Sequence, residues 1–524
     1  MYQQFENRIA QLVSTNQQVL LQNGLIGLEK ETLRVGQDGK IAQTPHPDVL
    51  GASLTHPYIT TDYSEALTEL ITPPFDNVTS ALEFLRDTQA FVYQHLGDEI
   101  LWATSMPCVV AGETSIPIAK YGTSNPGLMK TVYRRGLGHR YGRTMQVIAG
   151  VHYNYSLPES FWPVYRELEQ SSLELQDFIS EKYFDLIRNL LRYGWLVPYL
   201  FGASPAICKS FLAGQKTELD EFNPSTFYEP FATSLRMGDI GYQNNKEKAT
   251  GVHANYDSIL DYVTSLSEAI STPYKGYEKF GVCVDGKYQQ LNTNILQIEN
   301  EYYSTVRPKQ LLNGNEKPVL ALKKRGVRYV ELRSLDVNAF DPLGINETQA
   351  YFLEIFMLFC LLQESPRFSS DEKLAIDQNE LLTAHRGRDK ACQLSDRGQS
   401  HCLKTWAKEL FEKMQVIAEI LDIGKVGAPY QKALDKLAER IRDSDATPSA
   451  RMLNAMRNNN EGFYDFAMRM SLQHQEYFKQ HKLDVERIKQ FEKWATDSHK
   501  NQADLETNND QDFANYLAKY FAQS

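Results

Sequence analysis

Glu29 and Glu31 lie two positions apart in residues 28–35, Leu-Glu-Lys-Glu-Thr-Leu-Arg-Val, a segment typical of a β-strand. Because side chains alternate between the two faces of a strand, both carboxylates should share one face, with Lys30 on the other. Two like charges repel, but a divalent cation such as Mg²⁺ would reverse the sign of the interaction, since carboxylate oxygens are its ligands. The alternative is a solvated strand edge that resists aggregation, and this segment alone favours it.

Three further segments repeat this alternation of a polar and an apolar face. Such strands are typical of an antiparallel sheet with one wet face. Carboxylates, histidine, asparagine and arginine on that face, rather than lysine and threonine, predict a lined polar cavity. The polar faces would carry Tyr329, Glu331 and Arg333 in residues 328–335, Gln297, Glu299 and Glu301 in residues 294–302, and His152 and Asn154 in residues 150–156.

Two other polar groups have helical spacing. Residues 60–71 predict a helix with Asp62, Glu65 and Glu69 on one face, and a solvated helix surface is the favoured explanation of this pattern. Residues 121–146 gather basic side chains in an otherwise acidic chain. Arginine forks match phosphate oxygens, so a phosphate-holding surface and an exposed helix face are equally good interpretations. The basic residues are Lys130, Arg134, Arg135, His139, Arg140 and Arg143.

Composition narrows the class of protein. The net charge of −11 argues against binding to nucleic acid or to an anionic membrane as the main task. No apolar run approaches the roughly 20 residues that span a bilayer, and residues 1–20 do not form a secretory signal. We therefore expect a soluble cytoplasmic protein. Scattered cysteines predict reduced thiols and no structural zinc, the residues being Cys108, Cys208, Cys283, Cys360, Cys392 and Cys402.

The remaining periodicity predicts two regions. Amphipathic patterns predict helices within residues 1–22, 78–96, 158–195 and 255–271, and a strongly apolar, buried helix over 346–364. Residues 199–206 predict a packed loop. Beyond residue 365 the chain becomes charged and helical, and the tail from about 498 is polar enough to be loosely ordered. We expect a catalytic domain over residues 1–365 and a mainly helical region over 366–524 packed on it.

Common catalytic motifs are absent from the sequence. It contains no P-loop, no G-x-G-x-x-G loop, no G-x-S-x-G elbow and no H-E-x-x-H. The remaining constellation combines clustered carboxylates, one histidine and several arginines on antiparallel strands. Such groups hold divalent ions and neutralise a transferring phosphoryl group, so either an ATP-dependent ligase or a metal-dependent phosphohydrolase fits.

Nine segments, in order between about residues 24 and 345, resemble the glutamate–cysteine ligase family of γ-proteobacterial type. Any one of them is weak, but nine in order are specific, whereas the C-terminal third matches only as a helical region. They are Gly-Leu-Glu-Lys-Glu-Thr-Leu-Arg-Val at 27–35, Ile-Thr-Thr-Asp-Tyr at 59–63, Tyr-Gly-Thr-Ser-Asn at 121–125, Gly-Val-His-Tyr-Asn at 150–154, Tyr-Leu-Phe-Gly-Ala-Ser-Pro-Ala at 199–206, Ala-Thr-Ser-Leu-Arg at 232–236, Gln-Ile-Glu-Asn-Glu at 297–301, Arg-Pro-Lys at 307–309 and Val-Glu-Leu-Arg-Ser-Leu-Asp at 330–336.

The resemblance implies an α+β, glutamine-synthetase-like catalytic fold, in which an antiparallel sheet flanked by helices forms a funnel-shaped site. It also implies the reaction. ATP phosphorylates the γ-carboxylate of L-glutamate, and the amine of L-cysteine displaces phosphate. The products are γ-glutamylcysteine, ADP and phosphate, in the first step of glutathione biosynthesis. Cations on the phosphates and arginines on the transferred group carry such chemistry.

Matching positions imply roles for particular residues. Arg333 would be the phosphoryl-transfer arginine, beside Glu331. We expect a monomer that glutathione inhibits by feedback; a different amine acceptor, a phosphohydrolase and a nucleotide or metal sensor are the alternatives. Tyr63 stands where some relatives have Phe. The shell for Mg²⁺, or alternatively Mn²⁺, would comprise Glu29, Glu31, Asp62, Glu69, His152 and Glu331, and the amino acids would contact Tyr63, Tyr133, Arg134, Gln146, Arg236 and Tyr242.

Overall fold

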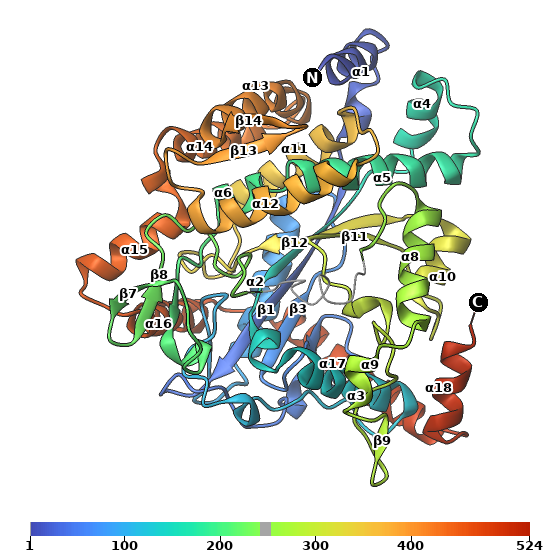
Figure 1. The fold of residues 1–524 in the computed structure, drawn as a ribbon, viewed down its shortest axis with the longest axis vertical. Helices are drawn as coiled ribbons and strands as arrows, with labels where there is room; N and C mark the ends of the chain where they lie inside the picture. Colours follow the sequence, from blue (N-terminus) through green and yellow to red (C-terminus); the bar gives the residue numbers. More distant parts are fainter. Residues whose placement is uncertain (1, 242–252, 524) are drawn as a thin grey trace.

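An antiparallel sheet forms the centre of the computed structural model, which describes residues 2–241 and 253–523 (Figure 1). Its strand order is β11-β12-β5-β1-β3-β2, and β4 pairs with the end of β1. Helices flank the sheet, so the prediction of an antiparallel sheet with helices is confirmed. The strands are β1 (Leu25–Val35), β2 (Ile59–Thr61), β3 (Leu67–Ile71), β4 (Ile100–Leu101), β5 (Val151–Ser156), β11 (Val306–Lys309) and β12 (Tyr329–Leu335).

Strand register brings the predicted polar residues onto one face. Glu29 is paired with His152 of β5, and Glu31 with Glu69 of β3. On the other side of β5, Asn154 is paired with Glu331 of β12. Because residues directly opposite each other in an antiparallel pair point to the same side, these side chains form one polar surface. The predicted strand faces in residues 28–35, 150–156 and 328–335 are confirmed.

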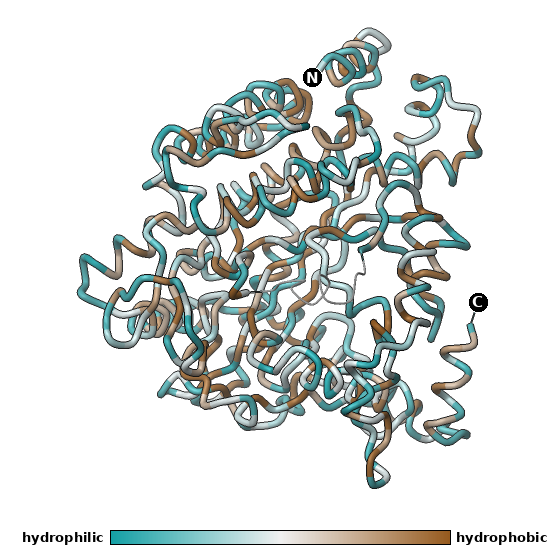
Figure 2. The backbone as a smooth tube through the Cα atoms, viewed as in Figure 1, coloured by the Kyte–Doolittle hydropathy of each residue, from teal (hydrophilic) through white to brown (hydrophobic). Residues whose placement is uncertain are grey.

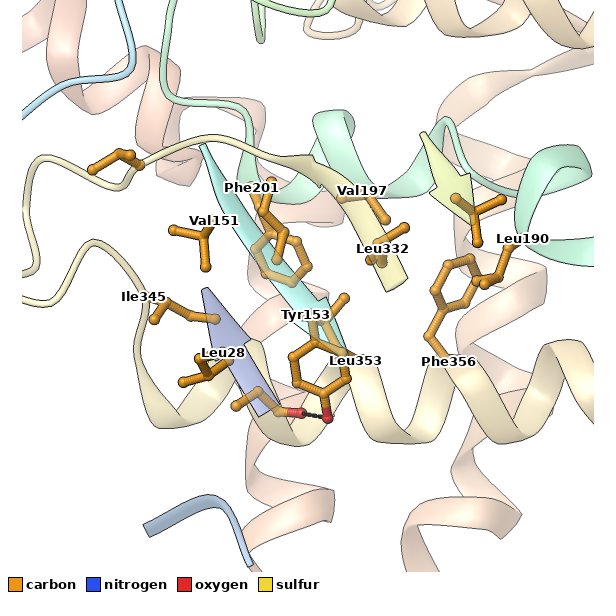
Figure 3. Close-up of a cluster of buried hydrophobic side chains, with 14 of the residues drawn as sticks. Leu28, Val151, Tyr153, Leu190, Val197, Phe201, Leu332, Ile345, Leu353 and Phe356 are labelled. Atoms are coloured by element: carbon orange, nitrogen blue, oxygen red, sulfur yellow. Dashed lines mark hydrogen bonds between the residues drawn. The ribbon is translucent and has the colours of Figure 1, made fainter. Parts of the chain in front are cut away.

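The opposite face of the sheet is apolar and is covered by helices. Leu28, Val151, Tyr153 and Leu332 pack near Leu353 of α11 (Glu347–Leu362), as Figure 3 shows. This helix is apolar on nearly all sides and almost wholly buried, which confirms the helix predicted over 346–364. Its N-terminus is fixed by a capping box between Asn346 and Gln349.

Lys30 is the exception on this apolar face. It lies between Glu29 and Glu31 in sequence but points away from them, and it is 3% exposed. Its ammonium donates to Oε1 of Gln89 at 2.7 Å and to the carbonyl of Pro342 at 3.1 Å. Burial lowers the pKa of Lys30 to about 7, against the raising effect of Asp341. These hydrogen bonds satisfy a charge-bearing group inside the core.

The other helices and small sheets surround this centre. Figure 2 shows the outer helices alternating between hydrophilic and hydrophobic segments, as expected for helices with one buried side. They are α1 (Gln3–Ser14), α2 (Val78–Tyr93), α3 (Asn125–Tyr141), α4 (Phe161–Leu168), α5 (Leu175–Arg192), α6 (Leu196–Phe201), α8 (Ile259–Ser271), α9 (Lys275–Glu278), α10 (Pro318–Arg325), α12 (Ser370–Arg386), α13 (Leu403–Leu421), α14 (Pro429–Arg442), α15 (Pro448–Asn458), α16 (Phe463–Gln480), α17 (Val485–Thr507) and α18 (Phe513–Phe521), with the short strands β6 (Ala206–Cys208), β7 (Asp220–Asn223), β8 (Thr226–Tyr228), β9 (Cys283–Val284), β10 (Lys287–Tyr288), β13 (Gln393–Asp396) and β14 (Gln399–Cys402).

The C-terminal helices pack on two sides of the N-terminal part. Helices α13 and α14 lie against α11, whereas α16 and α17 lie against α2. The helical character predicted beyond residue 365 is confirmed, with the β13–β14 hairpin added. The division into a catalytic domain over residues 1–365 and a helical region over 366–524 stays a prediction. No helix among the described residues is long and apolar enough to span a bilayer.

Two predicted elements are wrong. Residues 60–71 form the β2–β3 hairpin instead of a helix, so Glu65 turns away from Glu69 and accepts from the backbone N–H groups of His46 and Lys120. The helical spacing of the acids arose by chance from two strands and a turn. Residues 294–302 form a loop and a 3-10 turn (Glu299–Glu301) instead of a strand, since asparagine side chains bond to the local backbone and stabilise turns.

Three smaller predictions also need correction. The tail from 498 is helical, because α17 continues to Thr507 and α18 follows. Residues 199–206 begin inside α6 before they become a loop. Cys108 and Cys208 form a disulfide rather than two reduced thiols. Folding brings their Cα atoms to 5.5 Å across a sequence separation of 100 residues, so spacing along the chain carries no signal of this pair.

Candidate active site

A cavity of about 520 Å³ lies over the polar face of the sheet. Strands β1, β3, β5, β11 and β12 form its floor, and α3 with residues 295–303 forms walls. Most of the predicted site residues line it together. They are Glu29, Glu31, Asp62, Tyr63, Glu69, Tyr133, Arg134, Gln146, His152, Glu331 and Arg333.

Three side chains on the cavity floor have the geometry of a metal site. Glu29, His152 and Glu331 each offer a ligand atom within 4.8 Å of the others. Nδ1 of His152 lies 3.0 Å from Oε2 of Glu29 and 3.7 Å from Oε1 of Glu331. Nδ2 of Asn154 donates to Oε1 of Glu29 at 2.8 Å and fixes that carboxylate. Oε2 of Glu331 is buried without a hydrogen-bond partner, so it has a free lone pair for a cation.

The carboxylates differ strongly in their electrostatics. Burial raises the pKa of Glu69 well above its ordinary value, and the neighbouring Glu29 and Asp62 raise it further. Burial also raises the pKa of Glu31, whose Oε2 accepts from the N–H of Gly150 at 2.8 Å. Burial thus disfavours the charged forms of Glu31 and Glu69, whereas a bound divalent cation would favour them.

Glu331 lies at the boundary between the acidic and basic sides of the cavity. Burial disfavours its charge, but Lys309 and Arg333 overcome this and hold its pKa well below the ordinary value. Nζ of Lys309 is 3.3 Å from Oε1 of Glu331, and Nη1 of Arg333 is 3.2 Å from the same oxygen. Burial opposes the charge of Arg333 as well, yet Glu331 and Glu31 raise the pKa of that guanidinium. Both ions persist throughout the neutral pH range.

The strand β11 supplies basic residues that sequence reasoning did not assign to the site. Arg307 and Lys309 line the cavity, and Arg307 is paired in register with Glu331. The guanidinium of Arg307 donates to the carbonyls of Asn300 and Tyr302. The positions of Arg307 and Lys309 on either side of Pro308 were a usable signal of a basic strand face, because residues 307 and 309 point to the same side of a strand.

The α3 wall carries aromatic and basic groups opposite β11. Nε of Arg134 donates to the carbonyl of Asp62 at 2.5 Å, and its guanidinium packs 4.7 Å from the centre of the Tyr121 ring. Burial raises the pKa of Tyr63 and of Tyr133, so both are neutral phenols. Lys130, one turn before Arg134, also lines the cavity; the sequence named it only among the basic residues of 121–146, without a role of its own. This wall offers hydrogen-bond donors and aromatic surface to a small polar ligand.

The predicted basic surface is divided. Arg140 is buried and pairs with Glu301 at 2.9 Å, and it also donates to Oε1 of Gln290. The guanidinium of Arg135 donates to the carbonyl of Tyr288. These arginines hold the wall together, so a single phosphate-holding surface over residues 121–146 is wrong. Only the Lys130 and Arg134 side of the helix faces the cavity.

Two predicted site residues are not among those lining the cavity. Arg236 lies beside it: its guanidinium donates to the carbonyl of Arg333 at 2.9 Å and lies 3.6 Å from Asp336. A side chain at Gly150 would collide with that guanidinium, so the glycine permits its close approach to β5. Tyr242 lies outside the described residues.

Comparisons with known proteins identify the family of the chain. The family model described as glutamate-cysteine ligase matches residues 9–382. The chain is 48% identical to a glutamate–cysteine ligase of Alcanivorax borkumensis over 521 residues, which cover 98% of this chain and 99% of that protein. It is also 48% identical to one of Pseudomonas aeruginosa over 515 residues, covering 98% and 97% of the two chains.

Solved structures extend the likeness to three dimensions. A crystal structure of a glutamate–cysteine ligase from Francisella tularensis in complex with AMP has a TM-score of 0.89 and 35% identity, covering 95% of this chain and 97% of that one. A bifunctional glutathione synthetase from Pasteurella multocida, 24% identical, shares the fold with a TM-score of 0.74 over 93% of this chain and 58% of that one. The family model, the sequence relatives and the fold agree, and the chain belongs to the glutamate–cysteine ligase family.

Proposed function

We propose that this chain joins the γ-carboxylate of L-glutamate to the amine of L-cysteine at the expense of ATP, giving γ-glutamylcysteine, ADP and phosphate. The reaction is the first step of glutathione biosynthesis. One observation carries the proposal: a cluster of carboxylates and a row of basic residues face each other in one cavity and meet at Glu331. Phosphoryl transfer needs this combination of cation ligands and fixed positive charge.

The floor of the cavity would hold the divalent cations. Glu29, His152 and Glu331 fit such an ion because their ligand atoms converge and one carboxylate oxygen lacks a partner. Glu31, Asp62 and Glu69 complete the acidic shell. When bound, Mg²⁺, or Mn²⁺ in its place, supplies positive charge to the phosphates of ATP. Asn154 orients Glu29 for this purpose.

The basic row would act on the transferred phosphoryl group. Arg333 points into the cavity from β12 while Glu331 holds one of its nitrogens. Its Nε is buried without a hydrogen-bond partner, so the fork keeps donors for phosphate oxygens. Because Glu331 fixes the guanidinium before substrate arrives, the charge needs no reorganisation in the transition state. Lys309 and Arg307 extend the positive surface along β11.

The α3 wall would bind the amino acids. Tyr63, Tyr133, Arg134 and Gln146 offer aromatic surface, a cation and an amide within the same cavity. We further propose that Arg236 takes part from behind Gly150, and that Tyr242 contributes from outside the described residues. A glutamine-synthetase-like funnel, a monomeric state, a cytoplasmic location and feedback inhibition by glutathione belong to the same proposal.

A coupled assay of ADP release tests the function. The ligase predicts ADP formation that requires glutamate, cysteine and Mg²⁺ together, with γ-glutamylcysteine formed in equal amount. ADP release that does not depend on glutamate or cysteine would instead support a phosphohydrolase. Tight ATP binding without turnover would support a sensor. Replacing cysteine by 2-aminobutyrate, which lacks the thiol, separates a cysteine ligase from a ligase for another amine.

A further inference from the structure

The C-terminal end of the chain wraps around the outside of α3. Residues 506–523, which we call the C-terminal strap, comprise the end of α17, a short turn and α18, and Figure 1 shows α18 beside α3. Oε1 of Glu506 accepts from the N–H of Thr123 at 2.7 Å. Nδ2 of Asn125 donates to the carbonyl of Gln511 at 2.9 Å. The strap thus holds the first turn of α3 by hydrogen bonds.

An apolar cluster joins the strap to the α3 wall. This cluster is separate from the main core. Tyr133 and Ile298 pack against it and also line the cavity, so each touches the cluster on one side and the site on the other. The cluster consists of Met129 and Val132 of α3, Leu291, and Tyr516, Leu517 and Tyr520 of α18.

A buried lysine fastens the far end of the strap. Nζ of Lys317 donates to the carbonyls of Phe521 at 2.9 Å and Gln523 at 3.0 Å, at the C-terminus of α18. Lys317 is 6% exposed and directly precedes α10. A cation at this position satisfies carbonyls that the helix leaves unpaired and complements its dipole. The strap therefore bridges the α3 wall and the segment that follows β11.

Helix α3 needs such external support. It contains Gly127, Gly136 and Gly138, and glycine destabilises a helix interior relative to alanine. The glycines are dictated by close neighbours, because a Cβ at Gly136 would collide with Gln297 and one at Gly138 with the hydroxyl of Tyr63. The site thus requires a helix with poor intrinsic stability, whose conformation must come from tertiary packing.

We propose that the C-terminal strap is a positioning element for the reaction: it holds Tyr133 and Arg134 at the amino-acid side of the cavity. The inference rests on the proposed function for the identity of the ligands. It assigns a role to a segment beyond residues 9–382, the part of the chain that the family model matches. The strap touches no reacting group, so its effect is on geometry, to which catalysis is sensitive at the scale of 1 Å.

The test compares Tyr520→Ala and Lys317→Met with wild type. Both variants are expected to raise KM for glutamate and for cysteine by about tenfold. KM for ATP should stay within about twofold, because β11 and β12 are held by their pairing within the sheet. Amide hydrogen exchange over residues 125–141 should accelerate. Lys317→Arg keeps a cationic donor and should restore wild-type values. Tyr477→Ala, which removes a tyrosine from an exposed position on α16, is the matched control.

The outcomes separate this inference from the proposed function. Unchanged exchange over residues 125–141 overturns the inference, as do KM values that rise equally for all three substrates or for neither amino acid. If Tyr520→Ala does not fold, Lys317→Met alone tests the inference, because it removes only the hydrogen bonds from Lys317 to the end of α18. If wild type shows no ADP release that requires both amino acids, the proposed function fails. If the proposed function fails, faster amide exchange over residues 125–141 in the variants still supports the contact between the strap and α3. Unchanged exchange still overturns the inference about the strap.

Discussion

Replacing Arg333 by lysine keeps a positive charge in the cavity but removes the planar fork of the guanidinium. In the structure Nη1 is occupied by Glu331 at 3.2 Å, while Nε is buried without a partner. An ammonium is a single point of charge. It cannot bind Glu331 and present a second, fixed donor to phosphate oxygens at the same time. The variant therefore keeps the ion pair and loses the preorganised donor.

The magnitude follows from that loss. Removing one preorganised donor to a developing negative charge typically lowers kcat by about 10²- to 10³-fold. The charge retained by lysine reduces the effect, so we expect kcat to fall at least about tenfold, which is ~1.4 kcal/mol of transition-state stabilisation. KM for ATP should change by less than about threefold, because the lost interaction acts mainly in the transition state.

The assay is coupled ADP release at saturating ATP, glutamate and cysteine. Arg328→Lys is the matched control, since Arg328 directly precedes the same strand but forms an exposed ion pair with Glu159. That variant should keep wild-type kcat, because exposed ion pairs contribute little. An Arg333→Lys enzyme that keeps more than about a tenth of wild-type kcat would refute the role given to the guanidinium.

Three further predictions follow from the cavity and the core. Glu29→Gln should lower kcat by about 10²-fold or more with an unchanged circular dichroism spectrum, because a cation ligand is lost; near-normal activity would contradict the metal assignment. Chelation by EDTA should abolish ADP release and excess Mg²⁺ should restore it, whereas activity that persists in the chelator would contradict a metal requirement. Burial raises the pKa of Glu354 from 4.5 to about 7, although the hydroxyl of Tyr430 donates to it at 2.6 Å. The folded state thus favours the protonated form, whose stabilisation is complete below pH 4.5 and is lost as pH rises through 7, to a total of about 3 kcal/mol. Thermal unfolding of Glu354→Gln should therefore lack the part of the wild-type decrease in Tm that occurs between about pH 5 and 8, and equal decreases would refute this assignment.

The strands of the site were predictable because their signal is local. Glu29 with Glu31, and Glu331 with Arg333, repeat every second residue, which only an extended strand converts into one face. The hairpin that carries Asp62 and Glu69 was missed because Glu65 lies in its turn. Asp62, Glu65 and Glu69 therefore have the spacing of three and four residues that is typical of one helical face. Both residues nevertheless line the cavity, where the resemblance to the family had placed them in a metal shell, and that role stays a prediction.

Other features depend on contacts that no local pattern records. The alternation of Arg307 and Lys309 is local, but their position opposite Glu331 follows only from the pairing of β11, an edge strand that tolerates Pro308, with β12. The pairing of Arg140 with Glu301 buries two charges that look solvent-exposed in sequence. Likewise, the tail beyond residue 498 is polar on average. Its few aromatic residues stabilise a helix only because they pack on α3, a contact that the sequence does not show.

The inward-facing Lys30 has a consequence for how β1 selects its alignment. A shift of β1 by one residue relative to its neighbours would place the ammonium among the metal-binding groups and press Glu29 and Glu31 against the apolar α11. Both changes are unfavourable at once: Gln89 and Pro342 would lose their donor, and two carboxylates would be buried without partners. Lys30 therefore helps to specify the register of β1. The shifted registers are destabilised, and only the observed register assembles the site.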